Sequence, residues 1–331
     1  MPTILLTHSP DMLANYYGES ALAALHKLGS LRRNDTGRVL DTRALIEAAR
    51  GCDIVISDRQ TAGPAEFFDN APDLAAFLRV AVDIRNIDVE AASAQGILVT
   101  RASPGFAASV AEMAIGFMID RGRHVSEAAE AYHAGCAPQA RMGRQLKGAT
   151  VGIIGYGVIG EYLADLALAF GMTVLVADPY KKVVATGLAQ VALPDLLARS
   201  DFVVCLAIAN EATENLMNAA AFAAMKKTAY FINLSRGNLV DEAALAAALD
   251  EKRISGAALD VGRAADQMPT PSLAARTDVI ATPHIAGLTP DAAEHQAFDT
   301  VRQVEALLAG RVPEGAVNAA EARRLDRLRR S

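Results

Sequence analysis

The 331-residue sequence has only three cysteines, Cys52, Cys136 and Cys205, which are far apart and odd in number. This spacing excludes a disulfide framework and matches no metal-ligand motif, so we expect no bound metal and a reducing compartment. Basic residues are not in excess either, because 32 Lys and Arg stand against 38 Asp and Glu. A chain with a net charge of −6 has no basic stripe for phosphates, so nucleic acid is not an expected partner.

Long apolar runs are also missing. No stretch approaches the ~20 apolar residues of a membrane-spanning helix, and residues 1–7 lack the charged and apolar regions of a signal peptide. We therefore expect a cytoplasmic protein with no membrane partner. A dense basic run at residues 323–330 is expected to form a frayed or amphipathic terminus.

Short apolar runs alternate with helical patterns over the first hundred residues and again after residue 150. This alternation predicts an α/β fold with parallel sheets, and the length of the chain favours two domains. A long helical pattern from Ser109 to about Ala134 separates the two series. The first series has no phosphate-binding turn of its own.

The second series begins with a glycine-rich turn between an apolar run and a helical pattern. Residues 151–154 are apolar, the next six read Gly-Tyr-Gly-Val-Ile-Gly, and the helical pattern covers residues 161–170. In such a motif Gly155 permits a tight turn, Gly157 lets the backbone approach a pyrophosphate, and Gly160 lets helix and strand pack closely. The helix N-terminus then offers free N–H groups to the phosphates.

The next apolar run, residues 173–177, ends at an acid that indicates the kind of dinucleotide. Asp178 lies 23 residues after Gly155 (178 − 155 = 23), close to the ~20 expected for the acid that binds the adenosine ribose. Its carboxylate would accept hydrogen bonds from the ribose hydroxyls and repel a 2′-phosphate. The sequence therefore predicts NAD as the cofactor, in preference to NADP.

Three polar residues lie at the ends of later predicted strands. Arg236 follows the apolar run 229–234, Asp260 lies near the end of the run 256–261, and His284 follows residues 279–281. Ligands of open parallel sheets bind at the carboxyl ends of the strands, so the three residues should converge on the cofactor crevice. An arginine can hold a carboxylate in bidentate fashion, and a histidine can exchange a proton near neutral pH.

In this order the motifs resemble those of the NAD-dependent D-2-hydroxyacid dehydrogenase family. The resemblance rests on G-x-G-x-x-G, the following aspartate, N-x-x-R-G, L-D-V and T-P-H-I-x-G, and extends upstream to residues 86–92 and 109–112. It implies two doubly wound parallel-sheet domains, with a Rossmann NAD-binding domain (residues 104–287) inserted into a flavodoxin-like substrate domain (residues 1–103 and 288–331). It also implies a homodimer formed through the NAD-binding domains.

The resemblance assigns roles to individual residues. It implies that Arg236 binds the substrate carboxylate, that His284 is the general acid/base, and that Asp260 contacts the nicotinamide carboxamide. The other substrate-binding residues are expected to be Arg59, Ala81 and Val82. The residues expected to contact NAD are Gly155, Tyr156, Gly157, Val158, Ile159, Gly160, Asp178, Pro179, Thr213, Leu234, Ser235, Asp260 and Gly287.

The sequence departs from the family at the third catalytic position. The family usually has a glutamate about five residues after the L-D-V aspartate, which orients the histidine and favours its protonated form. Counting without gaps places Ala265 there. We expect Asp266, one residue further, to be the catalytic acid, with Gln267 as the alternative.

Two other functions stay open at this point. The missing glutamate is compatible with an NAD(H)-sensing binding protein, as in the co-repressor branch that resembles the family. A formate dehydrogenase-like enzyme would pair Gln267 with the histidine. Because Arg236 and His284 are both present, the sequence favours an oxidoreductase that acts on a D-2-hydroxy acid or a 2-oxo acid.

Overall fold

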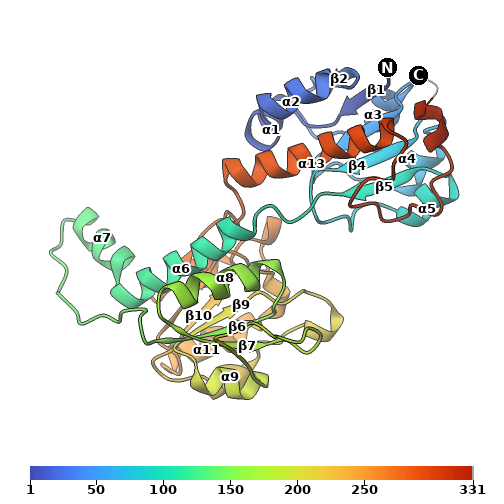
Figure 1. The fold of residues 1–331 in the computed structure, drawn as a ribbon. Coiled ribbons are helices and arrows are strands. Elements are labelled where there is room, and N and C mark those ends of the chain that lie inside the picture. Colours follow the sequence, from blue (N-terminus) through green and yellow to red (C-terminus); the bar gives the residue numbers. More distant parts are fainter. Residues whose placement is uncertain (330–331) are drawn as a thin grey trace. The chain divides into compact units, whose positions relative to one another are not determined.

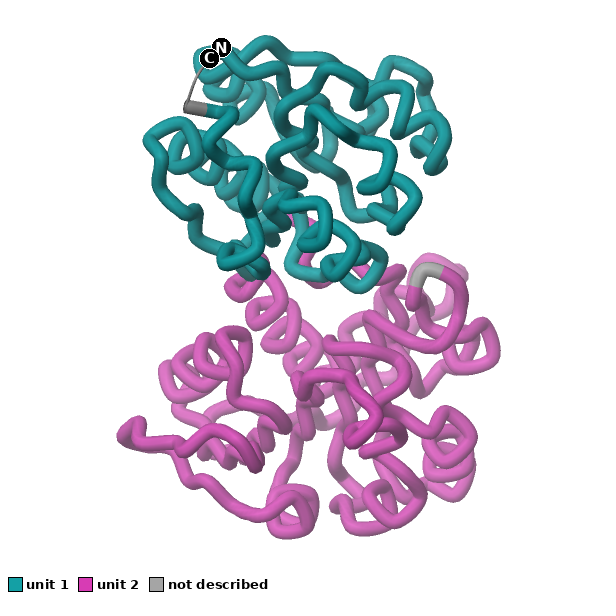
Figure 2. Tube along the Cα trace, turned by 90° about the vertical axis from the view of Figure 1, so that its right-hand side faces the viewer, with its two compact units in different colours: residues 1–105, 290–331 teal, residues 106–289 magenta. Residues whose placement is uncertain are grey.

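The computed structural model describes residues 1–329, apart from the side chains of Asp266 and Arg329. The chain divides into two compact units: unit 1 comprises Met1–Gly105 and Pro290–Ser331, and unit 2 comprises Phe106–Thr289 (Figure 2). Each unit has one parallel sheet with helices on both faces, which confirms the expected fold class. The chain changes unit after Gly105 and Thr289, whereas the sequence predicted changes after residues 103 and 287.

Unit 1 is built on five strands in the order β2-β1-β3-β4-β5, which is the strand order of flavodoxin-like domains (Figure 1). Its strands are β1 Thr3–Leu6, β2 Ser30–Arg33, β3 Ile54–Ser57, β4 Ala76–Arg79 and β5 Leu98–Arg101. Its helices are α1 Pro10–Tyr16, α2 Glu19–His26, α3 Thr42–Ala49, α4 Ala65–Asp69, α5 Val89–Ala94, α13 Pro290–Leu308 and the 3-10 helix η4 Leu325–Arg329. Helices α1, α2 and α13 cover one face, and α3, α4 and α5 cover the other. The central strands β1, β3 and β4 are mostly apolar because both of their faces are buried, whereas the edge strand β2 is polar and largely exposed.

Unit 2 has seven strands in the order β12-β11-β10-β9-β6-β7-β8, the doubly wound order of dinucleotide-binding domains with one added strand. The strands are β6 Thr150–Ile154, β7 Thr173–Ala177, β8 Leu188–Gln190, β9 Phe202–Cys205, β10 Tyr230–Asn233, β11 Gly256–Leu259 and β12 Val279–Ala281. The helices are α6 Ala107–Arg123, α7 Val125–His133, α8 Val158–Ala169, α9 Leu193–Arg199, α10 Ala219–Ala224, α11 Glu242–Asp250, α12 Pro271–Ala274, and the 3-10 helices η1 Glu211–Thr213, η2 Gly237–Leu239 and η3 Ala265–Gln267. Helices α6 and α8 pack on one face of the sheet, and α9, α10 and α11 pack on the other (Figure 1).

The long helix expected from Ser109 to about Ala134 is two helices, α6 and α7. His124 takes a left-handed backbone conformation (φ 57°) that ends α6. The Asp120 side chain then accepts the N–H of Ser126 at 2.9 Å, which caps the start of α7. Neither piece, nor any other helix in the described part of the chain, is long and apolar enough to cross a membrane.

The basic C-terminal run packs on unit 1 with apolar residues inward, which agrees with the amphipathic terminus that was expected as one of two forms, and not with the frayed one. Arg324 Nη1 donates to the carbonyl oxygens of Ala71 (2.8 Å) and Leu74 (3.1 Å), and Arg327 Nη1 donates to that of Pro72 (2.6 Å). Leu328 is buried in the unit 1 core. These arginines therefore satisfy backbone acceptors of the turn before β4.

His8, directly after β1, is a buried histidine that is neutral at physiological pH. It is 1% exposed, and its ring lies edge-on to that of Tyr17 with 5.3 Å between the centroids. Nδ1 has no hydrogen-bond partner among the described residues. Burial lowers the pKa of His8 to about 4, although Asp58 raises it, and Arg79 lowers it further.

The stability of unit 1 should therefore fall as the pH drops from about 6.5 toward 4. The unfolded chain takes up a proton near the ordinary histidine pKa of ~6.5, whereas folded His8 does so only near pH 4. The unfolded state thus binds more protons in this window and gains stability relative to the folded state. Each pKa unit corresponds to ~1.4 kcal/mol, so His8 should account for roughly 3 kcal/mol of the free energy of unfolding that is lost on acidification. We expect His8→Phe not to show this loss.

Urea unfolding at pH 7 and pH 4 measures the effect. His26→Asn, which replaces an exposed histidine of the same unit, is the matched control. If His8→Phe loses as much stability on acidification as the unsubstituted protein, His8 is not the group that titrates.

Candidate active site

Of the three glycines in the turn after β6, Gly155 and Gly160 are required by packing against neighbouring backbone, whereas Gly157 is not. A Cβ on Gly155, whose φ is +94°, would lie 2.7 Å from the backbone nitrogen of Ala207, and a Cβ on Gly160 would overlap the carbonyl oxygen of Gly155. A Cβ on Gly157, in contrast, would have no neighbour within 4 Å among the described residues. The turn therefore keeps a backbone-lined space open at Gly157.

Gly157 is also the N-cap of α8, and its backbone is extended there. In the described structure no side chain caps this end, so the first N–H groups of α8 are available to an anion. The helix has 12 residues, so its N-terminus carries the partial positive charge of an aligned peptide series. Val158 and Ile159 contribute the first two N–H groups of the helix. The turn thus fits the pyrophosphate of NAD.

Asp178, after β7, faces the same turn. Its Oδ2 accepts the N–H of Tyr156 at 2.8 Å, and its Oδ1 accepts those of Tyr180 (2.8 Å) and Lys181 (2.9 Å) around Pro179. Partial burial raises the pKa of Asp178, but these backbone donors and the charge of Lys181 lower it by more, so it lies below the usual range. A carboxylate accepts about four hydrogen bonds, so one position is left for a ribose hydroxyl.

Lys181 is a neighbour of this acid that the sequence did not single out. Its Nζ pairs with Glu161 of α8 and lies 5.2 Å from the centroid of the Tyr156 ring. The cation beside Asp178 is therefore engaged by a second carboxylate. The role of Asp178 toward the adenosine ribose stays a prediction.

Arg236, Asp260 and His284 lie in the turns after three adjacent strands. β10 pairs with β11, and β11 pairs with β12, all in parallel register. The carboxyl ends of these strands therefore lie side by side at one end of the unit 2 sheet. The sheet brings the three turns together, as the sequence predicted.

The buried carboxylate of Asp260 holds the loop that carries His284. Asp260 is 1% exposed, and its carboxylate accepts the Oγ1–H of Thr282 (2.5 Å) and the N–H groups of Ile285 and Ala286 (both 2.9 Å). Its carbonyl oxygen accepts the N–H of His284 at 2.9 Å. His284 itself has a left-handed backbone (φ 54°), which this set of bonds keeps in place. In the sequence, the only sign of this anchoring role is an acid at a strand end.

The turn that carries Arg236 is fixed by Asn233, which the sequence analysis did not assign. Asn233 Nδ2 donates to the carbonyl oxygen of Arg236 (3.0 Å), and its Oδ1 accepts the N–H of Ser235 (3.1 Å). Ser235 Oγ donates to the carbonyl oxygen of Ala207 at 2.6 Å. Arg236 Nη1 donates to the carbonyl oxygen of Ser235 at 2.7 Å. These bonds orient the base of the Arg236 side chain.

The loop after β11 contains both candidates for the third catalytic position. The side chain of Asp266 lies outside the described set, so its role stays a prediction. The loop is closed by two backbone bonds, from Gly262 N–H to Gln267 O (2.8 Å) and from Ala264 N–H to Met268 O (3.1 Å). Gln267 has a positive φ of 60°, and its Oε1 is buried without a hydrogen-bond partner among the described residues. Gln267 therefore stays the alternative.

The remaining cofactor candidates of unit 2 lie at or near strand ends. Leu234 is buried directly after β10, and Thr213 ends η1 with its Oγ1 bonded to the carbonyl oxygen of Ile208 at 2.8 Å. A Cβ on Gly287 would approach the Cβ of Phe106 to 3.1 Å. Their contacts with NAD stay predictions.

In unit 1 the expected substrate-binding residues follow β3 and β4. The Arg59 guanidinium lies 5.9 Å from the centroid of the Tyr16 ring. Ala81 and Val82 follow β4, where Val80 N–H bonds Ser57 O and Ala81 O accepts Ala102 N–H, both at 3.0 Å.

The Arg59 turn is braced from inside by two buried charged residues that the sequence analysis missed. The Asp58 carboxylate accepts the N–H groups of Gln60 (2.7 Å) and Thr61 (3.0 Å). Arg79 is fully buried and donates to the carbonyl oxygens of Asp58 and Thr61 and to Asn86 Oδ1. The only signal in the sequence was an arginine at the end of an apolar strand.

Gly157→Ala should leave the fold intact and weaken NADH binding. Its φ of −80° suits alanine, and the methyl group meets nothing in the described protein. The methyl would, however, fill the space through which a pyrophosphate approaches the backbone. We expect the dissociation constant for NADH to rise by about tenfold or more, which corresponds to ~1.4 kcal/mol, at an unchanged melting temperature.

NADH fluorescence titration and thermal unfolding measure the two effects. Gly160→Ala is the contrasting variant, because its Cβ overlaps the carbonyl oxygen of Gly155, and it should lower the melting temperature as well. Unweakened NADH binding by Gly157→Ala would mean that no phosphate approaches this position.

Residues 115–286, within unit 2, match the family model of the D-isomer specific 2-hydroxyacid dehydrogenase NAD binding domain. The chain is 34% identical over 308 residues to the (S)-sulfolactate dehydrogenase of Chromohalobacter salexigens, a match that covers 91% of this chain and 98% of the relative. It is 32% identical over 305 residues to the D-3-phosphoglycerate dehydrogenase of Methanocaldococcus jannaschii, covering 91% of this chain. The chain spans only 57% of the length of that relative.

The chain is also similar in fold to solved structures. A putative D-isomer specific 2-hydroxyacid dehydrogenase from Polaromonas sp. JS6 66 superimposes with a TM-score of 0.86 at 25% identity, covering 96% of this chain and 99% of the other. An acyclic imino acid reductase in complex with NADPH and D-Arg superimposes with a TM-score of 0.81 at 25% identity, covering 95% and 99%. The chain therefore belongs to the D-2-hydroxyacid dehydrogenase family, and unit 2 contains its NAD-binding domain.

Proposed function

We propose that the protein is an NAD-dependent oxidoreductase that interconverts a D-2-hydroxy acid and the corresponding 2-oxo acid. The observation that carries this proposal is the adjacency of the turns bearing Arg236 and His284, on either side of β11, in a sheet whose glycine turn fits NAD. Family membership supports the same reaction class.

The chain's own side chains supply binding and proton transfer. Arg236 holds the substrate carboxylate and the neighbouring 2-oxygen in bidentate fashion. His284 donates a proton to the 2-oxygen during reduction and removes it during oxidation. When bound, the nicotinamide cofactor supplies the hydride for reduction or accepts it in oxidation. Asp266, or Gln267 in its place, orients the His284 ring.

Unit 1 supplies the groups that select the substrate. We assign the backbone N–H groups of Ala81 and Val82 to the substrate carboxylate, and the Arg59 side chain to a distal anionic or hydroxyl group. The names of two relatives, a sulfolactate and a phosphoglycerate dehydrogenase, indicate substrates with a second anionic group. This supports an anionic tail as the partner of Arg59.

We also propose that the protein is a homodimer formed through unit 2. Helix α7 buries none of its own residues within the described chain. Tyr132 of α7 is 68% exposed, and Met142 in the following segment is 97% exposed. Large apolar side chains at such exposure fit a surface that a second copy covers.

NADH oxidation against a panel of 2-oxo acids, including glyoxylate, pyruvate, hydroxypyruvate and sulfonated or phosphorylated members, tests the proposed function. We expect turnover with at least one group of substrates. His284→Ala should lower kcat by about 10²–10⁴, the usual contribution of a positioned acid/base. His26→Ala, at an exposed histidine of unit 1, is the control.

The alternatives have their own outcomes. Tight NADH binding without turnover of any 2-oxo acid would favour an NAD(H)-sensing protein. Oxidation of formate alone would favour the formate dehydrogenase-like enzyme. Full activity of His284→Ala would remove His284 from the mechanism.

Asp178→Asn should shift the cofactor preference toward NADPH. The amide oxygen can still accept the N–H groups of Tyr180 and Lys181, although the amide nitrogen cannot accept that of Tyr156, and the negative charge that would repel a 2′-phosphate is lost. A like-charge contact costs several kcal/mol, so the ratio of kcat/KM for NADPH to that for NADH should rise by about tenfold or more. Asp165→Asn, an exposed acid on α8, is the matched control. An unchanged ratio would contradict the assignment of Asp178 to the ribose.

A further inference from the structure

Arg263 occupies the start of the loop that contains Asp266 and Gln267, and its guanidinium is tied to two other segments of unit 2. Nη2 donates to Glu214 Oε1 (2.8 Å) and to Asn215 Oδ1 (2.7 Å), which follow η1. The same nitrogen donates to the carbonyl oxygen of Asn238 (3.0 Å), and Nε donates to that of Val240 (3.2 Å). Asn238 and Val240 belong to the segment that directly follows Arg236 and Gly237. One side chain thus joins the loop to the segment that leads out of the Arg236 turn.

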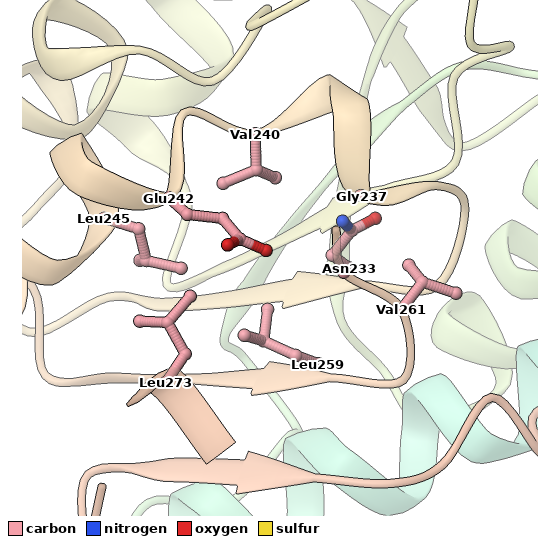
Figure 3. A pocket seen from close by; sticks show the side chains of 9 residues that line it. Asn233, Gly237, Val240, Glu242, Leu245, Leu259, Val261 and Leu273 are labelled. Carbon is pink, nitrogen blue, oxygen red and sulfur yellow. The ribbon is translucent and has the colours of Figure 1, made fainter. Parts of the chain in front are cut away.

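The backbone of Arg263 is held separately by Glu242, the first residue of α11. Glu242 Oε1 accepts the N–H of Arg263 at 3.0 Å. Figure 3 shows this carboxylate inside a small pocket, between Val240 and Leu259. An acid in such apolar surroundings needs a donor, and the loop provides one.

A contact between two glycines brings the loop and the Arg236 turn together. A Cβ on Gly237 would overlap the carbonyl group of Gly262, so the two backbones touch where neither residue has a side chain. A Cβ on Gly262 would in turn lie 2.6 Å from Cα of Pro269 and 2.8 Å from the carbonyl oxygen of Met268. The loop is therefore folded tightly against the segment that begins with Arg236.

We propose that Arg263 is a positioning residue for proton transfer, because it clamps the loop of residues 262–268 to the Arg236 turn. The clamp sets where the loop side chain that pairs with His284 stands, and so how far the protonated form of His284 is favoured. This inference rests on the proposed dehydrogenase function. It assigns a role to a residue that touches neither substrate nor cofactor in that mechanism.

The contacts of Arg263 should matter more for the position of the loop than for the stability of unit 2. The ion pair between Arg263 and Glu214 has side chains 36% and 42% exposed, and exposed pairs of this kind contribute little to stability. Removal of Arg263 should therefore leave unit 2 folded. A misplacement of about 1 Å at a catalytic group, in contrast, can cost about a hundredfold in rate.

The test compares Arg263→Ala, Arg263→Lys and the control Arg253→Ala, which breaks the exposed ion pair of Arg253 with Glu251. We expect Arg263→Ala to lower kcat for 2-oxo acid reduction by about ten- to a hundredfold, with KM for NADH within about twofold of the original because cofactor contacts are kept. The pH limit for reduction should move to lower pH, since a displaced partner favours protonated His284 less. Arg263→Lys should recover part of kcat, and Arg253→Ala should behave as the unsubstituted protein.

Amide hydrogen exchange of the peptide covering residues 260–270 gives a readout independent of turnover. The N–H groups of Gly262, Ala264 and Gln267 are hydrogen-bonded within the loop and should exchange faster in Arg263→Ala. If that variant does not fold, Arg263→Lys with the same two readouts takes its place, and unaltered exchange and pH profile overturn the proposal.

The possible outcomes distinguish a failure of the proposal for Arg263 from a failure of the proposed function. Absence of turnover in the unsubstituted protein would reject the proposed function, and the inference with it. Normal turnover together with an unchanged kcat and pH profile in Arg263→Ala would overturn the inference alone. A fall in kcat without a shift of the pH profile would mean that Arg263 has only a structural role.

Discussion

The candidate active site depends on one buried carboxylate, that of Asp260. It lies at the end of β11, between the strands that lead to Arg236 and His284, and it accepts three hydrogen bonds from the His284 loop. A buried carboxylate without donors would be costly, so the loop and the acid stabilise each other. The left-handed backbone of His284 costs free energy, and this set of hydrogen bonds holds the residue in that conformation. The position of His284, the residue that we propose transfers the proton, thus depends on a group that has no part in that transfer.

Backbone contacts at glycines then connect the turns. Gly155 and Gly160 let the helix α8 begin close to β6, and Gly237 and Gly262 let the Arg236 turn touch the loop after β11. Side chains at these four positions would push the neighbouring elements apart. The distances between those elements set the geometry of the site. Around them, Asn233 and Glu242 each bond to the backbone of a neighbouring turn. Rigid strands therefore carry turns that are cross-linked at their bases.

Much of the candidate site was predictable from the sequence because it depends on local residue patterns. The glycine turn, the acid after β7 and the polar residues at strand ends follow from spacing and from the geometry of parallel sheets. Arg79 and Arg263 were missed because most of their partners are carbonyl oxygens and side chains distant along the chain, and no spacing rule reports those contacts. Asn233 has local partners, Ser235 and Arg236, but an asparagine at a strand end does not by itself indicate them. The break at His124 was missed because a left-handed residue inside a helical pattern leaves no compositional trace. The basic tail stayed open between a frayed and an amphipathic terminus, because arginines that bind backbone acceptors look like solvent-exposed charges in a sequence.

Asp178 has a consequence for anyone who redesigns this protein for another coenzyme. The carboxylate that we assign to the adenosine ribose also accepts the N–H of Tyr156 in the middle of the glycine turn. Under that assignment, cofactor selectivity and the shape of the glycine turn depend on the same side chain. A replacement chosen only for its charge would also loosen the turn, so a successful redesign has to supply a new acceptor for that N–H together with a cation for the added phosphate.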